Sequence, residues 1–440
     1  MTSRVPAPRL TVPQGAALSI GAVLGTGVIV LPALAAQIAG PASLLAWLAL
    51  IALSVPLAAT FAALGARYPD AGGVSTYVRA AFGSRPAAVV GWSFYFAVPA
   101  GAPAAAMFGG AYVSVALGGG MRTTLVTAAL LIVAVSATNA GGLRISGRVQ
   151  LALAALLATL LLAATLAALP HARVENLQPF APHGWLAVGP AAAVLVWGFA
   201  GWEAVTSLAA DYRRPARDLP RVTAIALVVV GVLYLGVAAV SLLVLGPATG
   251  STEAPLAELL AIGIGGEVRV LTAVAAVLLT FGAMNAYFAG AAKLGAALGR
   301  DGALPPWFAR GSSAGEVPRR SLAVVSGMAS AALAVVAVAG VGPRASVLLT
   351  TGSLVLVYVL GTAAAIRLLP RDTWSRRAAI VAFAAVVVLL LMTGLYLLWT
   401  LAIALAAVAY ESRRRARSLS DADDPRTHAE PAILEREYQR

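Results

Sequence analysis

Residues 21–32 read Gly21-Ala22-Val23-Leu24-Gly25-Thr26-Gly27-Val28-Ile29-Val30-Leu31-Pro32, an apolar run that glycines interrupt and a proline closes. A second such run, residues 196–203, reads Val196-Trp197-Gly198-Phe199-Ala200-Gly201-Trp202-Glu203. Glycine costs about 1 kcal/mol relative to alanine in a helix interior and permits main-chain conformations outside the helix. The paired glycines therefore indicate either a close helix-packing face or a local break in a helix.

The composition places both runs in a membrane. Of the 440 residues, 60% are hydrophobic and 11% are charged, whereas an average soluble domain has about 25% charged residues. The mean hydropathy is +0.87. So little charge cannot cover a water-facing surface of this size, which identifies an integral membrane protein and excludes a soluble enzyme. The chain has no cysteine, and we expect neither a metal site nor a cofactor.

The apolar runs give the number of expected crossings. A helix needs about 20 apolar residues to cross a bilayer core of about 30 Å. The last run is too long for one crossing, and we divide it near Thr393 and Gly394, which predicts an all-α protein with twelve transmembrane helices. The runs cover residues 15–39, 42–65, 87–117, 123–139, 149–169, 185–209, 222–246, 268–297, 321–340, 345–366 and 378–410.

The basic residues indicate how the chain is oriented. With the N-terminus in the cytoplasm, 27 of the 31 lysines and arginines fall on the cytoplasmic side, and only Arg122, Arg173, Arg269 and Arg344 fall outside. This asymmetry follows the positive-inside rule and predicts a multi-pass protein of the cell inner (plasma) membrane with both termini cytoplasmic. The net charge of +13 comes mainly from these cytoplasmic loops and so follows from the membrane topology. We therefore expect membrane lipid as a partner and no nucleic acid.

The two glycine-interrupted runs occupy corresponding places in the chain. Each lies in the first helix of a group of five, and five crossings reverse the orientation, so the second group is expected to be an inverted copy of the first. Interrupted helices at such positions point to a transporter's central site. We expect a cytoplasmic N-terminus (1–14), a first repeat (15–169), an extracytoplasmic loop (170–184), a second repeat (185–368), two further helices (374–410) and a mostly disordered cytoplasmic tail (411–440).

The chemistry of a broken helix suggests what binds there. A break exposes N–H groups at the start of one half-helix and C=O groups at the end of another, and each is costly in hydrocarbon. An amino acid zwitterion satisfies both sets, its carboxylate on the N–H groups and its ammonium on the carbonyls. The predicted substrate-binding residues are Gly25, Thr26, Gly27, Val28, Trp197, Gly198, Phe199, Ala200, Gly201 and Trp202, although Trp202 fits lipid-facing packing equally well.

Glu203 is the one acidic residue well inside a predicted span. An ionisable group at that depth is a functional candidate by default. Burial disfavours its charged form, so Glu203 either exchanges a proton as the site opens and closes or, hydrogen-bonded, braces its helix. Tyr95, Asn285 and Tyr358 are other polar residues at depth; each either lines the pocket or makes an interhelical hydrogen bond.

At these residues the chain resembles the amino acid/polyamine/organocation (APC) transporters, and within them the bacterial exporters of methionine and branched-chain amino acids. The resemblance extends over about residues 10–410. It rests on four segments: Gly25-Thr26-Gly27-Val28 with Pro32; Tyr68-Pro69-Asp70-Ala71-Gly72-Gly73; Trp197-Gly198-Phe199-Ala200-Gly201-Trp202-Glu203-Ala204 with Asp211, Pro215, Arg217, Asp218, Pro220 and Arg221; and Arg300-Asp301-Gly302-Ala303-Leu304-Pro305-Pro306.

The resemblance implies the inverted five-helix-repeat fold first described for a bacterial leucine transporter, with two extra helices. It also implies alternating access, substrate held by helices one and six, and export of methionine, leucine, isoleucine and valine. Some proton-coupled relatives carry a lysine in helix five, whereas the matching position here is Leu157. Glu203 thereby becomes the leading proton site, and sodium coupling stays open.

Other functional classes fit the sequence less well. An intramembrane enzyme needs a nucleophile–base pair or a metal cluster at depth, and the predicted spans contain no histidine or cysteine. A channel needs polar or charged rings along several spans. An importer or exchanger of the same superfamily remains the main alternative, and a non-transporting amino-acid sensor is a remote one. The sequence leaves the oligomeric state open.

Overall fold

The computed structural model describes residues 10–68, 73–142, 147–203, 212, 214–312 and 316–422. Within these ranges the regular structure is helical, and the pairing of Leu10 with Tyr212 is an isolated bridge. Ten helices in the described ranges are long and apolar enough to cross a membrane. The expected features at residues 1–9, 69–72, 204–211 and 423–440 lie outside the described residues.

The first part of the chain contains the expected interruption in its first apolar run. A short 3-10 turn, Thr26–Ile29, separates its two helices. The helices of this part are α1 (Val12–Val23), α2 (Leu31–Ala39), α3 (Ser43–Arg67), α4 (Val74–Phe82), α5 (Ser84–Leu117), α6 (Gly120–Ala140) and α7 (Gly147–Ala168).

The second part begins with a short helix and continues with longer ones. Its helices are α8 (Val188–Phe199), α10 (Pro215–Leu245), α11 (Pro255–Ile264), α12 (Val268–Arg300), α13 (Arg319–Ala339), α14 (Arg344–Leu368), α15 (Trp374–Met392) and α16 (Leu397–Ala422). The expected division near Thr393 and Gly394 is confirmed, because α15 ends and α16 begins on either side of it. The short helix α11 was not expected. Helix α16 runs on to Ala422 instead of ending at residue 410.

The helices pack around two buried clusters. One joins α5, α6, α12 and α13 through residues such as Met107, Phe288 and Val325. The other joins α1, α2, α3, α8, α10 and α14, and α5 contributes to both. Apolar side chains also point outward from α6, where Val126, Leu130 and Val133 are more than half exposed, as expected for a lipid-facing stripe.

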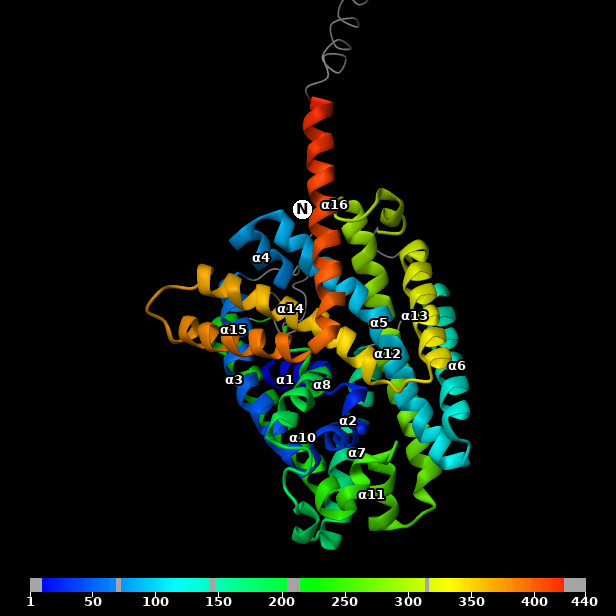
Figure 1. Ribbon diagram of the computed structural model, residues 1–440. Coiled ribbons are helices and arrows are strands. Elements are labelled where there is room, and N and C mark those ends of the chain that lie inside the picture. The colour runs from blue at the N-terminus through cyan, green and yellow to red at the C-terminus, as the bar shows by residue number, and fades with distance from the viewer. Residues whose placement is uncertain are drawn as a thin grey trace, which may run out of the picture.

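The two ends of the bundle are easily told apart in Figure 1. Helix α4 and the projecting last turns of α16 lie at one end, which we call the α4 end, and α11 lies at the opposite end. Helices α5 and α12, each more than 30 residues long, run between these ends. They form a long shared framework against which the broken helices pack.

Candidate functional site

The first apolar run contains a break at its glycines. Helix α1 ends at Val23, and Leu24 and Gly25 leave the helical conformation before the 3-10 turn. Helix α2 then begins at Leu31. Of the two interpretations that the sequence allowed, the local break is therefore the one that the structure shows.

A second break follows α8. Ala200, the residue after its last turn, has extended main-chain angles of φ −73° and ψ 144°. Gly201 has φ +122°, a conformation that side chains rarely adopt. A Cβ atom on Gly201 would lie 2.7 Å from the carbonyl oxygen of Ala22 and 3.0 Å from its carbonyl carbon. The two breaks thus touch main chain to main chain.

Tyr234, a fully buried residue of α10, links the two breaks through its hydroxyl group. That hydroxyl lies 2.9 Å from the carbonyl oxygen of Val23 and 2.9 Å from the carbonyl oxygen of Gly198. Each of these carbonyls belongs to the last turn of a helix that stops inside the protein, where it lacks an intrahelical partner. Sequence reasoning missed Tyr234, and the one available signal was that it is the single aromatic residue of the apolar run 222–246.

Glu203 lies directly beyond the second break and is held by two donors. The Tyr358 hydroxyl donates a hydrogen bond to its Oε2 atom at 2.5 Å, and the Gly201 N–H donates to the same oxygen at 3.1 Å. A hydroxyl–carboxylate bond of this length is typical of a charge-assisted contact. Tyr358 comes from α14, so this contact ties the break to a helix that follows 155 residues later in the chain.

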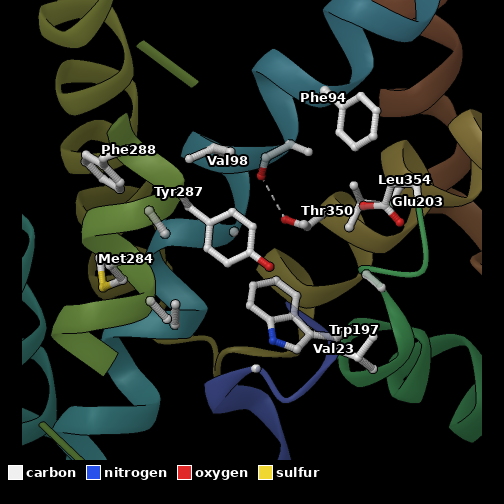
Figure 2. Close-up of a pocket in the computed structure, with 17 residues that line it drawn as sticks. Val23, Phe94, Val98, Trp197, Glu203, Met284, Tyr287, Phe288, Thr350 and Leu354 are labelled. Carbon is white, nitrogen blue, oxygen red and sulfur yellow. Dashed lines mark hydrogen bonds between the residues drawn. The ribbon is translucent and has the colours of Figure 1, made fainter. Parts of the chain in front are cut away.

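A cavity of about 120 Å³ lies beside the two breaks (Figure 2). Figure 2 shows the rings of Tyr287 and Trp197 near its centre, with Met284 and Phe288 on the side away from Glu203. Its described lining is mainly apolar and aromatic. It consists of Val23, Gly25, Phe94, Ala97, Val98, Gly101, Ala102, Ala105, Trp197, Ala200, Glu203, Ala283, Met284, Tyr287, Phe288, Thr350 and Leu354.

A second cavity of about 350 Å³ continues from the same breaks. Gly25, Glu203, Ala283 and Tyr287 line both cavities, and the second extends between α1, α7 and α12 toward Gln150 in the first turn of α7. Leu157, the position that the sequence analysis compared with the lysine of helix five, lines this second cavity. Glu203 and Tyr287 therefore stand where the two spaces meet.

Several of the glycine and aromatic residues chosen from the sequence shape the breaks from behind the cavity. A Cβ atom on Gly27 would lie 2.2 Å from the Trp197 ring, so glycine is what lets this ring lie against the main chain. Gly198 packs in the same way against the Leu31 side chain. Phe199 stacks edge-on against Tyr234, with ring centroids 5.3 Å apart.

The other residues chosen from the sequence lie away from the cavity lining. Val28 is fully buried, and of Thr26 only the main chain is described. Trp202 is 1% exposed and donates from Nε1 to the Ser54 hydroxyl at 3.1 Å, so it packs on α3 rather than facing lipid. Tyr95 donates to the Ser321 carbonyl. Asn285 accepts hydrogen bonds from α6 through its side-chain oxygen. Both make interhelical hydrogen bonds.

Sequence comparison connects this architecture with known proteins. A family model described as amino acid permease matches residues 10–413. The chain belongs to the amino acid permease family. The expected membership of the APC transporters is thereby confirmed.

The relatives of this permease are themselves transport proteins. It is 31% identical over 398 residues to the uncharacterised amino acid permease YecA of Bacillus subtilis (strain 168), a match that covers 90% of this chain and 94% of YecA. It is 32% identical over 361 residues to the L-methionine/branched-chain amino acid exporter YjeH of Escherichia coli (strain K12), covering 81% and 85% of the two chains. The branched-chain amino acid permease BcaP of B. subtilis (strain 168) is 28% identical over 241 residues, about half of each chain.

Proposed function

We propose that this permease exports neutral apolar amino acids, with methionine, leucine, isoleucine and valine first, in exchange for protons by alternating access. The observation that carries the proposal is the meeting of two helix breaks at an apolar cavity with Glu203 in its wall. The name of the relative YjeH supports the same substrates and direction.

The breaks offer partners for the charged groups that all α-amino acids share. The main chain at Gly25 to Val28 opens a helical segment, and its N–H groups suit the substrate carboxylate. The last turn of α8 ends in carbonyl oxygens that suit the ammonium group, those of Trp197 and Phe199, next to the Gly198 carbonyl that contacts Tyr234. Recognition of the substrate backbone thus needs no charged side chain.

The cavity wall favours an apolar side chain on the substrate. Met284, Phe288 and Val98 supply apolar surface, and among the described lining residues Glu203 is the one charged group. A substrate side chain with a positive or negative charge would lose its hydration there, at a cost that an apolar wall does not repay. Leucine and methionine lose little by leaving water, because burying their side chains is favourable.

Glu203 provides a physical basis for exchange with protons. The ammonium group of a bound substrate favours the ionised form of the Glu203 carboxylate. Protonation of Glu203 removes the attraction between the two groups. Substrate and proton then bind in alternation, which is the requirement for antiport. Glu203 lines both cavities, so its carboxyl group can meet one space and then the other as the breaks move.

The same proposal includes the topology. Helices α1 and α2 together make one crossing, and α8 contributes to another, which brings the total to twelve. The first ten form an inverted five-helix repeat, with α15 and α16 outside it. The α4 end, where Arg79, Arg300 and Arg414 lie, faces the cytoplasm in agreement with the positive-inside rule.

Counterflow in proteoliposomes tests the substrate assignment. Vesicles loaded with unlabelled leucine should accumulate radiolabelled leucine, and outside methionine, isoleucine and valine should compete while lysine, arginine and glutamate should not. Competition by the charged amino acids would overturn the substrate class. Binding without any counterflow would favour a sensor, and an absence of proton-driven efflux with intact exchange would favour an importer or exchanger.

A further inference from the structure

A third cavity, of about 410 Å³, lies at the α4 end, outside the site described above. It is bounded by α4, α5, α12 and α16, which come together at this end in Figure 1. Its wall includes Arg300 and Asp301, the first two residues of the segment Arg300–Pro306 that the sequence resemblance singled out and that the transport site does not use.

Helix α16 closes this cavity with two oppositely charged residues one turn apart. The buried Glu411 accepts a hydrogen bond from the Ser84 hydroxyl at 2.9 Å, at the start of α5. Arg414 donates to the Asp301 carbonyl oxygen at 2.7 Å, at the end of α12. A carboxylate at a helix N-terminus and a guanidinium at a helix C-terminus are both favourable positions, so the wall is a built feature of the fold.

The cavity combines an apolar floor with a rim that carries both signs of charge. The charged residues are Arg79, Arg300, Asp301, Glu411 and Arg414, and the floor consists of Val90, Gly91, Phe94, Leu294, Ala297 and Leu298. Arg300 Nε lies 3.4 Å from Asp301 Oδ1, and the side chains of this ion pair are 58% and 49% exposed. An exposed ion pair of this kind contributes little to stability, so a ligand can exchange partners with it at small cost.

Phe94 connects this cavity with the transport site. Its side chain lines both the cavity beside the helix breaks and the cavity at the α4 end. A ligand on the α4 side would therefore touch a ring that also forms the wall of the transport cavity.

We propose that the cavity at the α4 end is a second binding site for a zwitterionic amino acid with an apolar side chain. The apolar side chain of the ligand packs on the floor next to Phe94, its carboxylate binds the guanidinium groups and its ammonium binds the carboxylates. An arginine has five N–H donors, and the contact that Arg414 makes with Asp301 leaves donors for a carboxylate. The ligand class rests on the proposed function, and the site faces the cytoplasm in the proposed topology.

Binding stoichiometry tests this second site. Equilibrium dialysis of the purified full-length protein against saturating radiolabelled leucine should give two leucines bound per chain. The double variant Arg79→Gln/Arg414→Gln should bind one, a loss of half of the bound label. The matched double variant Arg85→Gln/Arg413→Gln, which removes two exposed arginines outside this wall, should still bind two.

A second variant separates occupancy of the cavity from its charge. Ala297→Phe places a ring on the floor without changing charge, and it too should bind one leucine while retaining counterflow. One leucine per wild-type chain, unchanged in either wall variant, would overturn the second site and leave the proposed transport function standing. No bound leucine in the wild type would overturn both.

Discussion

Substitution of Gly201 by alanine probes the contact between the two helix breaks. Gly201 has φ +122°, where a residue with a Cβ atom is strained by about 1–3 kcal/mol. The added methyl group would also lie 2.7 Å from the Ala22 carbonyl oxygen, and that atom belongs to the main chain. The conformational strain is thus a lower bound on the destabilisation, and we expect Gly201→Ala to lower the free energy of unfolding by at least about 1–3 kcal/mol.

Gly290 in α12 provides the matched control. A Cβ atom there would meet nothing within 4 Å, and the residue lies within a regular helix. Gly290→Ala should therefore stabilise the protein by about 0.5–1 kcal/mol. The two alanine variants should differ by about 1.5–4 kcal/mol, the sum of the two effects.

Thermal unfolding of the purified variants in detergent micelles, followed by circular dichroism, measures this difference. Leucine counterflow in the same variants reports whether the breaks still form the site. We expect Gly201→Ala to unfold at a lower temperature and to transport slowly, whereas Gly290→Ala should transport like the wild type. Equal unfolding temperatures and equal transport would refute the contact between the breaks.

Three further substitutions test other parts of the site. Gly27→Ala should slow counterflow at least about tenfold in a folded protein, since its Cβ atom would lie 2.2 Å from the Trp197 ring; unchanged counterflow would argue against that packing. Tyr234→Phe should cost about 1–3 kcal/mol in unfolding measurements, because the buried Gly198 carbonyl loses the Tyr234 hydroxyl, whereas the Val23 carbonyl still accepts from the Gly25 N–H; a neutral effect would contradict the bridge. Met284→Ala should weaken the competition of unlabelled leucine in counterflow by about 10–200-fold and favour phenylalanine, because the cavity loses part of its apolar wall. An unaltered order of competitors would place the substrate elsewhere.

The sequence was most informative where main-chain chemistry is local. Glycine pairs in apolar runs indicated breaks near Gly25 and Gly201, and both lie where helices stop. The division near Thr393 and Gly394 was predicted from the length of the last apolar run, which exceeds one crossing, and α15 ends and α16 begins on either side of it. These features depend on a few consecutive residues, so an isolated stretch of sequence contains the necessary information.

The cavity wall could not be predicted in this way. Phe94, Tyr287 and Thr350 lie in three different apolar helices, and only tertiary packing brings them together. A helix that is apolar all round gives no periodic signal for which face points inward. For the same reason the sequence could not show whether the Trp202 ring faces lipid or the interior. In the structure Trp202 is 1% exposed and faces the interior.

Leucine flux driven by a pH gradient in proteoliposomes tests the proposed transport cycle most directly. The comparison is between the wild type, Glu203→Gln and Glu258→Gln, the last an acidic residue paired with Arg269 outside both cavities that meet at the breaks. We expect an imposed gradient to accelerate leucine movement in the wild type and in Glu258→Gln, and Glu203→Gln to exchange leucine without responding to the gradient. A gradient response in Glu203→Gln equal to that of the wild type would contradict Glu203 as the proton site, and no leucine flux in any protein would contradict the transport site itself.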